Sequence, residues 1–299
     1  MVSVWSQKYG GSWHHRTDLA PGRYWVESAL ATSNTDDGTD AAETLIGAGV
    51  LAFNQGDNAA ARLQYDRALQ LGLRLGDQRV IAYAHLFESI LTTIMDGELE
   101  RASALMNVAE ELFGGVGESW GIAMVRCRQS VMARIRGDYT GARALGQQGL
   151  ELFENLGDRF GIGHALLTLG QAELADCEPR RAMAQFLAMI TAMQEIGNSW
   201  FVARGLFCLA TAACMCAESD LSATLLGCAD SLRDSFGAPV YLQDVDDYAR
   251  VHTELVTKLG EAQFQRAYAE GRFTRHMEMT RRLIGRGVIG DVHEVPRPG

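Results

Sequence analysis

The chain has 299 residues, of which 47% are apolar, 21% are charged and five are proline. It is long enough for one extended repeat domain or two ordinary domains, and so little proline leaves long helices uninterrupted. The formal net charge of −10 at pH 7 excludes the overall basic character of most nucleic-acid-binding domains.

The amino terminus predicts no targeting signal. Met1 to Trp5 lack a basic segment followed by an apolar stretch, and the sequence contains no run of 18 apolar residues. We therefore predict a cytoplasmic protein without a signal peptide or membrane span. The six cysteines include no Cys-x-x-Cys pair, so we expect small buried thiols in a reducing compartment rather than a zinc site.

Four segments follow one another along the chain. Residues 1–39 are predicted to form a leading, imperfect repeat, and residues 40–237 to form five clearer helical repeats. Each clear repeat is expected to contain two helices with apolar residues at helical spacing. Residues 238–284 are predicted to form a helical cap that is more charged than the repeats, and residues 285–299 a flexible tail.

Glycines recur at almost constant intervals through the repeats. One series, with steps of 41, 40, 40 and 40 residues, comprises Gly76, Gly117, Gly157, Gly197 and Gly237. A second series runs between them and comprises Gly56, Gly97 and Gly137, continued without glycine at Cys177-Glu178 and Glu218-Ser219. A fixed period of this size indicates stacked repeats, and glycine readily adopts the left-handed backbone that ends a helix. The predicted unit is therefore helix A, a tight turn, helix B and a glycine turn.

Small residues mark the places where two helices are expected to approach closely. Five residues after each marker of the second series stand Ala61, Ala102, Ala142, Ala182 and Ala223. Seven positions before these markers stand Gly49, Ser130 and Gly170, but also the larger Ile90 and Thr211. Twelve positions after them stand Ala68, Ala109 and Gly149, but also Met189 and Asp230. The pattern of small residues is therefore regular with a few departures.

This unit resembles the tetratricopeptide repeat, in a long form of about 40 residues. The segments Ser222–Pro239 and Leu259–Arg272 resemble the end of the repeat region in large actinobacterial regulators of the LuxR type, in which a signalling ATPase domain precedes the repeats. The resemblance implies an all-α, right-handed solenoid of five to six helix pairs with a helical cap. No GxxxxGK[ST] phosphate loop occurs in the chain, so the ATPase domain itself is not expected here.

No arrangement of residues in the sequence predicts catalysis. Gly285 to Gly290 spell GxGxxG, but this motif neither follows a predicted strand nor opens a predicted helix, as a dinucleotide site requires. The motifs GxSxG and HExxH do not occur. We therefore expect no enzyme activity, no cofactor and no metal.

The resemblance implies that helix A of each repeat lines a concave groove. Its groove positions correspond here to Glu43, Ile46, Val50, Phe53, Asn54, Phe87, Leu91, Ile94, Met95, Met124, Cys127, Val131, Arg134, His164, Leu167, Gln171 and Leu174. The predicted partner-binding residues among them are Phe87, Leu91, Arg134, His164 and Gln171. The alternative is that tighter packing buries these positions in the core.

The sequence predicts binding rather than catalysis. We expect a protein or peptide partner, or an inducer-like small molecule, within or beside a regulator that contains a signalling ATPase. An alternative is direct nucleic-acid binding through Arg272, Arg275, Arg281 and Arg282, which the acidic net charge disfavours. A third possibility is a fragment of a larger regulator that has no independent function.

Overall fold

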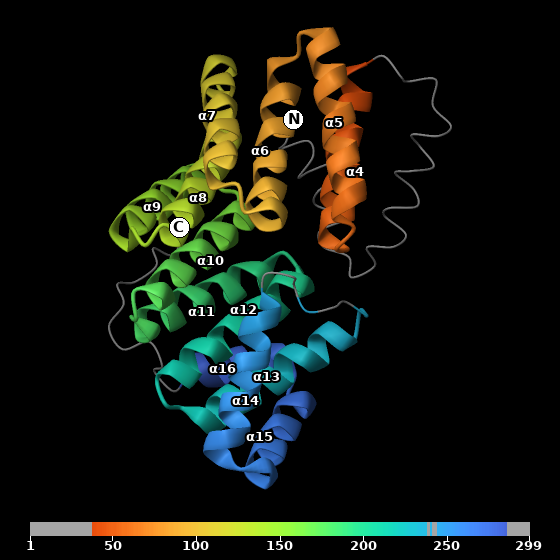
Figure 1. The fold of residues 1–299 in the computed structure, drawn as a ribbon. Coiled ribbons are helices and arrows are strands. Elements are labelled where there is room, and N and C mark those ends of the chain that lie inside the picture. The colour runs from red at the N-terminus through yellow and green to blue at the C-terminus, as the bar shows by residue number, and fades with distance from the viewer. Residues whose placement is uncertain (1–37, 238–239, 241–243, 286–299) are drawn as a thin grey trace. The chain divides into compact units, whose positions relative to one another are not determined.

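The computed structural model describes residues 38–237, 240 and 244–285, and these residues are almost entirely helical (Figure 1). Within these described ranges no strand occurs, which confirms the predicted all-α class. The predicted leading repeat, up to residue 37, and the predicted tail, from residue 286, lie outside the described residues. The chain divides into two compact units, residues 1–161 and 162–299.

The first unit consists of helices that pack in chain order. They are α4 (Thr39–Asn54), α5 (Asn58–Leu75), α6 (Gln78–Leu91), the π-helix η2 (Thr92–Asp96), α7 (Leu99–Val116), α8 (Ser119–Ile135) and α9 (Tyr139–Leu156). Each helix contacts the next, and α6 also contacts α4 and α8. Helix A of one repeat therefore lies beside helix A of the following repeat, as in a solenoid-like stack.

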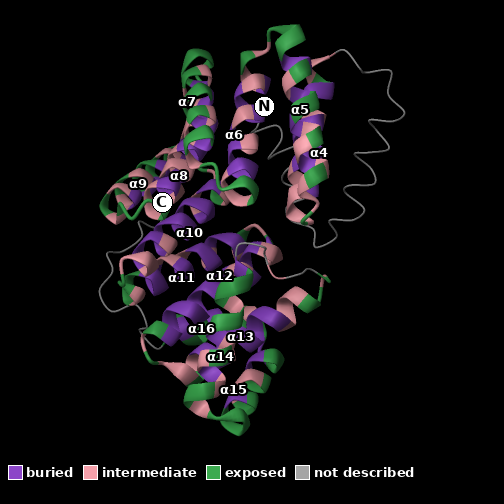
Figure 2. Cartoon of the chain, viewed as in Figure 1, coloured by how far each residue is buried: buried purple, intermediate pink, exposed green. Residues whose placement is uncertain are grey.

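The second unit contains two further helix pairs and the cap. Its helices are α10 (Arg159–Ala175), which begins just before the boundary, α11 (Pro179–Glu195), α12 (Ser199–Met215), α13 (Ser219–Asp234), α14 (Val245–Leu259), α15 (Glu261–Phe273) and α16 (His276–Gly285). Helix α12 is buried along most of its length (Figure 2). Of the cap helices, α15 packs along the repeat helix α13, and α16 contacts the repeat helices α11 and α13. The cap therefore folds back onto the last repeats.

The helices end in left-handed turns. Positive φ angles between 63° and 82° occur at Gly56, Gly76, Gly97, Gly117, Gly137, Gly157, Gly197 and Gly237. Cys177 and Ala217 adopt the same conformation, with φ of 58° and 60°, although each carries a Cβ atom. The left-handed turn is thus a property of the repeat and is kept even where glycine is absent.

The position of Ala217 corrects the register predicted for the last repeat. The sequence placed this turn one residue later, at Glu218, and therefore assigned Thr211 and Asp230 to positions where small residues were expected. Counted from Ala217, these two positions fall on Ala210 and Ala229, and the third small position falls on Ser222. The apparent departures were an error of one residue, because the pattern of glycines does not reveal a left-handed alanine.

The π-helix explains why Ile90 stands where a small residue was expected in the second repeat. Successive left-handed residues are 20 positions apart, except for Gly76 and Gly97, which are 21 apart. A π-helical turn accommodates one additional residue within an α-helix, and η2 ends at Asp96, directly before Gly97. Counted forward from Gly76, the small position is therefore occupied by buried Ser89 rather than Ile90.

The small positions on the A helices allow close packing against the B helices. A Cβ atom added at Gly49 would lie 2.2 Å from the Tyr65 ring, and one added at Gly170 would lie 2.4 Å from the Phe186 ring. At the equivalent position in α8, the Ser130 hydroxyl donates to the carbonyl oxygen of Ala142 at 2.6 Å. Helix B therefore fills the space above each small residue of helix A.

The cap is held by buried polar contacts as well as by packing. Arg204 on α12 forms a bidentate ion pair with Asp244, with nitrogen–oxygen distances of 2.8 and 3.1 Å. Buried Asp230 on α13 accepts hydrogen bonds from the hydroxyls of Tyr248 on α14 and Tyr268 on α15. These contacts link Asp244 and the cap helices α14 and α15 to the repeat helices α12 and α13.

Candidate functional site

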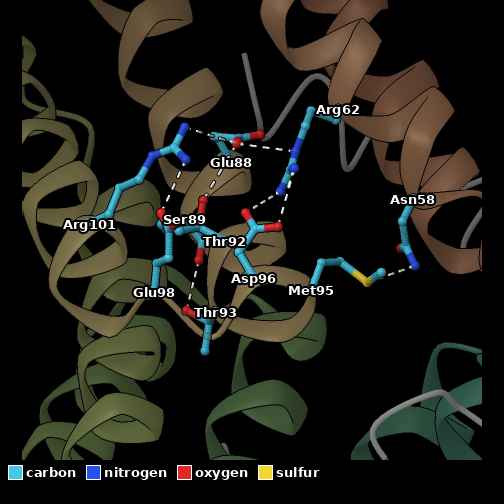
Figure 3. A network of polar contacts seen from close by, with 10 residues as sticks. All are labelled: Asn58, Arg62, Glu88, Ser89, Thr92, Thr93, Met95, Asp96, Glu98 and Arg101. Atoms are coloured by element: carbon cyan, nitrogen blue, oxygen red, sulfur yellow. Dashed lines mark hydrogen bonds and ion pairs between the residues drawn. The ribbon is translucent and has the colours of Figure 1, made fainter.

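A network of polar side chains surrounds the π-helix at the end of α6 (Figure 3). It draws on α5, α6, η2 and α7 of the first unit and comprises Asn58, Arg62, Glu88, Ser89, Thr92, Thr93, Met95, Asp96, Glu98 and Arg101. Because these side chains come from consecutive elements, their arrangement depends on how α5, α6 and α7 pack. The network is the candidate functional site of this unit.

Glu88 lies at the centre of the network. Its Oε1 atom is 3.4 Å from Arg62 Nε and 4.0 Å from Arg101 Nη2, and its side chain is 13% exposed. Its Oε2 atom is buried and accepts no hydrogen bond from any described residue. Burial raises the pKa of the Glu88 carboxyl, although the two arginines act in the opposite direction. A half-buried carboxylate is therefore held between two cations.

Arg62 and Arg101 extend the network to neighbouring elements. Arg62 donates to both carboxylate oxygens of Asp96, at 2.7 and 3.3 Å, and these hydrogen bonds raise the pKa of its guanidinium. Arg101 lies 3.2 Å from Glu98 at the start of α7. The two guanidinium groups therefore connect α5, the π-helix and α7 in a fixed arrangement.

Hydrogen bonds within the segment accompany the π-helix at the end of α6. The Thr93 hydroxyl donates to the carbonyl oxygen of Ser89 at 2.8 Å, four residues earlier, as threonine often does within a helix. The left-handed Gly97 then ends the segment, and the Glu98 amide donates to the carbonyl oxygen of Thr92 at 3.3 Å. The additional residue brings Asp96 beside Arg62 and leaves Met95 47% exposed.

Two predicted partner-binding residues lie on α6, and their environments differ. Phe87 is half-buried, and its ring stacks on Tyr65 at 5.5 Å and on Tyr83 at 6.3 Å between centroids. Leu91 is completely buried and belongs to the core, so its selection as a contact residue is corrected. The physical reason is that α6 packs against α4, α5, α7 and α8, so that Leu91 and its neighbour Ile90 are both enclosed.

The other three predicted residues are divided between the units. Arg134 is half-buried on α8 of the first unit, whereas His164 is buried and Gln171 is half-buried on α10 of the second. The His164 ring lies 6.3 Å from that of Phe201. Several further groove positions are buried in the cores of their units, namely Ile46, Met124, Cys127 and Leu167. Core burial, the alternative left open by the sequence, therefore holds for these positions.

The charged residues of the network were not selected from the sequence. Arg62, Glu88 and Arg101 belong to three different helices, and no regular spacing relates them. The one sequence signal was the interval of 21 residues between Gly76 and Gly97, which marks an insertion in α6. That signal locates the π-helix but does not identify the residues that pair around it.

The described residues do not support a metal site or a reactive thiol at Cys127. Within residues 38–237, 240 and 244–285, no group of three or more His, Cys, Asp or Glu residues is placed to hold a metal ion. Burial raises the pKa of the Cys127 thiol to about 12, which keeps it protonated at neutral pH. No helix among the described residues is long and apolar enough to cross a membrane.

No protein-family model matches this chain, and no curated protein matches it. Its structure is similar to the crystal structure of BtubC (BKLC) from P. vanneervenii, with a TM-score of 0.51 over 73% of this chain and 89% of that chain. The two sequences are 14% identical, so the similarity concerns the fold alone. It supports the assignment of this chain as a helical repeat protein.

Proposed function

We propose that this chain is a non-catalytic scaffold of tetratricopeptide-like repeats that binds a protein partner through the face around the π-helix of α6. The observation that carries this proposal is the combination of exposed Met95 and half-buried Phe87 with the paired charges of Arg62 and Asp96. Methionine, aromatic residues and arginine are the types enriched at protein interfaces. This mixture favours a protein partner over an inducer-like small molecule.

The fixed geometry of the network supports the same proposal. Arg62 is held by two hydrogen bonds to Asp96 and by the neighbouring Glu88. Side chains that are already ordered lose less conformational entropy when a partner binds. The network would therefore orient a partner, while Met95 and Phe87 supply apolar contact area. π-helical turns occur frequently at functional sites, which agrees with this assignment.

The partner is best sought among domains of a regulator. The resemblance of Ser222–Pro239 and Leu259–Arg272 to repeat regions of LuxR-type regulators suggests a signalling ATPase domain or a DNA-binding domain. Binding along the A helices would then alter the packing of the repeats or release the attached domain. This setting rests on resemblance and on the general use of repeat surfaces in binding.

Capture of the partner by matched surface variants tests the proposal. The full chain, Met95→Glu and Leu156→Glu would each be immobilised and exposed to a lysate of the native host, and retained proteins identified by mass spectrometry. Met95 and Leu156 are 47% and 46% exposed, so both changes place a charge on equally exposed sites of the same unit. We expect Met95→Glu to retain at least tenfold less partner and Leu156→Glu to retain it fully. Equal retention by all three proteins, or no retained protein, would contradict the proposal.

The groove predicted from the sequence has a separate test. A chain in which Arg134 and Gln171 are both changed to alanine should lose the partner if the A helices contact it along their length. Retention of the same partner at wild-type level would limit the contact face to the π-helical segment. Circular dichroism of each variant establishes that the helical fold is kept.

A further inference from the structure

Helix α16 carries apolar residues on two sides, and one side is covered by the second unit. Met279, Thr280 and Leu283 are buried on this covered side, where α16 contacts α11 and α13. Gln194 of α11 donates to the Thr280 hydroxyl at 3.0 Å and lies 3.1 Å from His276 Nδ1. These contacts fix the orientation of α16.

On the other side of α16, the residues are exposed within the part of the chain that the structure describes. Met277, Arg281 and Ile284 are related by four and three residues and therefore share one helical face. Met277 is 44% exposed and Ile284 is 53% exposed. Phe273, the last residue of α15, is 90% exposed and precedes Met277 by four residues. Extended Thr274 separates Phe273 from α16, so helical spacing relates only Met277 and Ile284. We name these three exposed apolar residues, Phe273, Met277 and Ile284, the cap patch.

The arginines around the cap patch fall into two classes. Arg272 pairs with Asp234 at 2.9 Å, and Arg282 pairs with Glu278 at 2.6 Å and with Glu270 at 3.3 Å. Arg275 and Arg281 are exposed and form no ion pair with any residue that the structure describes. The cap patch is therefore flanked by two uncompensated positive charges in a chain whose net charge is −10.

We propose that the cap patch binds an acidic amphipathic helix of another protein. The exposed apolar residues of α16 follow the spacing by which two helices pack along one face. At 10 residues, α16 is about 15 Å long, which matches two to three turns of a partner helix. Arg275 and Arg281 would select carboxylates on that helix, because complementary charge at an interface determines which partner is accepted.

The same observations disfavour nucleic acid as the ligand. Two of the four arginines that the sequence offered for phosphate contacts, Arg272 and Arg282, are already paired with carboxylates. Phosphate contacts also leave Phe273 and Ile284 without a role.

A designed pair of peptides tests the proposal with the full chain. Both are 18-residue helical peptides with leucines at positions i, i+4 and i+7, and the remaining exposed positions are glutamate in one and lysine in the other. We expect fluorescence anisotropy to show binding of the glutamate peptide, and binding of the lysine peptide to be at least tenfold weaker. Raising the salt concentration should weaken the glutamate complex, because exposed charges are screened.

Two variants separate the apolar and the charged contributions. The double change Phe273→Ser and Ile284→Ser should weaken binding of the glutamate peptide at least tenfold. The double change Arg275→Glu and Arg281→Glu should reverse the preference in favour of the lysine peptide. All four side chains are exposed, so both variants should keep the wild-type circular dichroism spectrum and melting temperature. Leu63→Ser, which removes an exposed leucine from the first unit, is the matched control and should bind like the wild type.

Three results would overturn the proposal. One is equal binding of both peptides to the wild type, and another is full binding by the Phe273→Ser and Ile284→Ser variant. The third is salt-sensitive binding of a 20-base-pair DNA duplex, or of phosphatidylserine vesicles, that exceeds binding of the glutamate peptide and is lost in Arg275→Glu and Arg281→Glu. That last result would assign the arginines to phosphate groups.

Discussion

Two helix contacts in the second unit depend on glycine in different ways. Between α10 and α11, a Cβ atom at Gly170 would meet the side-chain ring of Phe186 at 2.4 Å. Between α13 and α15, Cβ atoms at Gly227 and Gly271 would meet backbone carbonyl oxygens of the facing helix at 2.0 and 1.9 Å. In the repeat, a side chain fills the space beside the glycine, whereas in the cap the two helix backbones touch.

This difference indicates which helix contacts can accommodate a larger residue. A side chain can change its rotamer or shift by a few tenths of an ångström, but a carbonyl oxygen in a helix cannot move without its helix. The repeats are therefore expected to tolerate substitution by local repacking. A larger residue at the α13–α15 crossing is expected to push the two helices apart, because backbone meets backbone on both sides of this contact.

The largest loss of stability is expected where α13 crosses α15. Gly271→Ala would place a methyl group against the Thr224 carbonyl oxygen, so we expect the free energy of unfolding to fall by more than about 3 kcal/mol. Urea unfolding followed by circular dichroism measures this loss. If only the cap detaches, amide hydrogen exchange should accelerate selectively in residues 261–285. Wild-type stability together with wild-type exchange would show that the helices can separate without loss.

An intermediate effect is expected in the repeat contact. Gly170→Ala presses against the Phe186 ring and should lower the free energy of unfolding by about 1–3 kcal/mol. Adding Phe186→Leu should recover part of this loss, since a smaller side chain makes room for the methyl group. The comparison is Gly163→Ala on the same helix, where the added Cβ atom would meet the flexible side chain of Met193, with its terminal methyl at 2.0 Å and its Sδ and Cγ atoms at 3.3 and 3.4 Å. That change should cost less stability than Gly170→Ala, because the end of a methionine side chain moves more easily than a phenylalanine ring. Equal losses in both alanine variants would refute the distinction.

A smaller effect is expected at the turns, where no neighbouring atom lies close. Gly157 has φ of 63° and Ala217 has φ of 60°, so the same backbone is formed with and without a Cβ atom. Gly157→Ala should lower the free energy of unfolding, and Ala217→Gly should raise it, by about 1 kcal/mol each. Thermal unfolding of the two variants checks the opposite signs. Changes in the same direction would show that contacts rather than backbone conformation decide the stability of these turns.

The smallest effect is expected in the polar network of the first unit. Burial raises the pKa of Glu88 in the folded chain, so the folded state binds a proton at a higher pH than the unfolded state. As the pH falls from 7 through this raised pKa, the wild type should gain stability relative to Glu88→Gln. Urea unfolding of both proteins at several pH values between 7 and 4.5 measures the difference. A difference that does not change with pH would mean that the paired arginines cancel the effect of burial.

Much of the repeat architecture could be predicted from short-range patterns. The left-handed turns at Gly56 and Gly76 depend on one residue each, and glycine marks such positions directly. The predicted register was wrong at Ala217, because nothing about alanine indicates that it will adopt a left-handed backbone conformation. It was also wrong by one position in α6, where the interval between Gly76 and Gly97 contains one additional residue and Ser89 occupies the small position expected at Ile90.

The candidate sites were less predictable than the repeats. Phe87 was selected from its place on helix A, but the pairing of Arg62 with Asp96 joins residues 34 positions apart. The exposure of Phe273 depends on how α15 and α16 dock, since a phenylalanine at a helix end is more often buried. Sequence patterns describe residues on one element, whereas these features arise between elements.

The sequence by itself determined the all-α class, the period of the repeats and the small residues that let paired helices approach. These properties follow from backbone conformation and helical spacing, which are local. Only the tertiary structure decided that Gly227 and Gly271 face each other's helix backbones, that two tyrosines share Asp230, and that two arginines flank Glu88. Each of these contacts requires that separate helices pack at one particular angle and register, and no pattern within a single helix specifies that geometry.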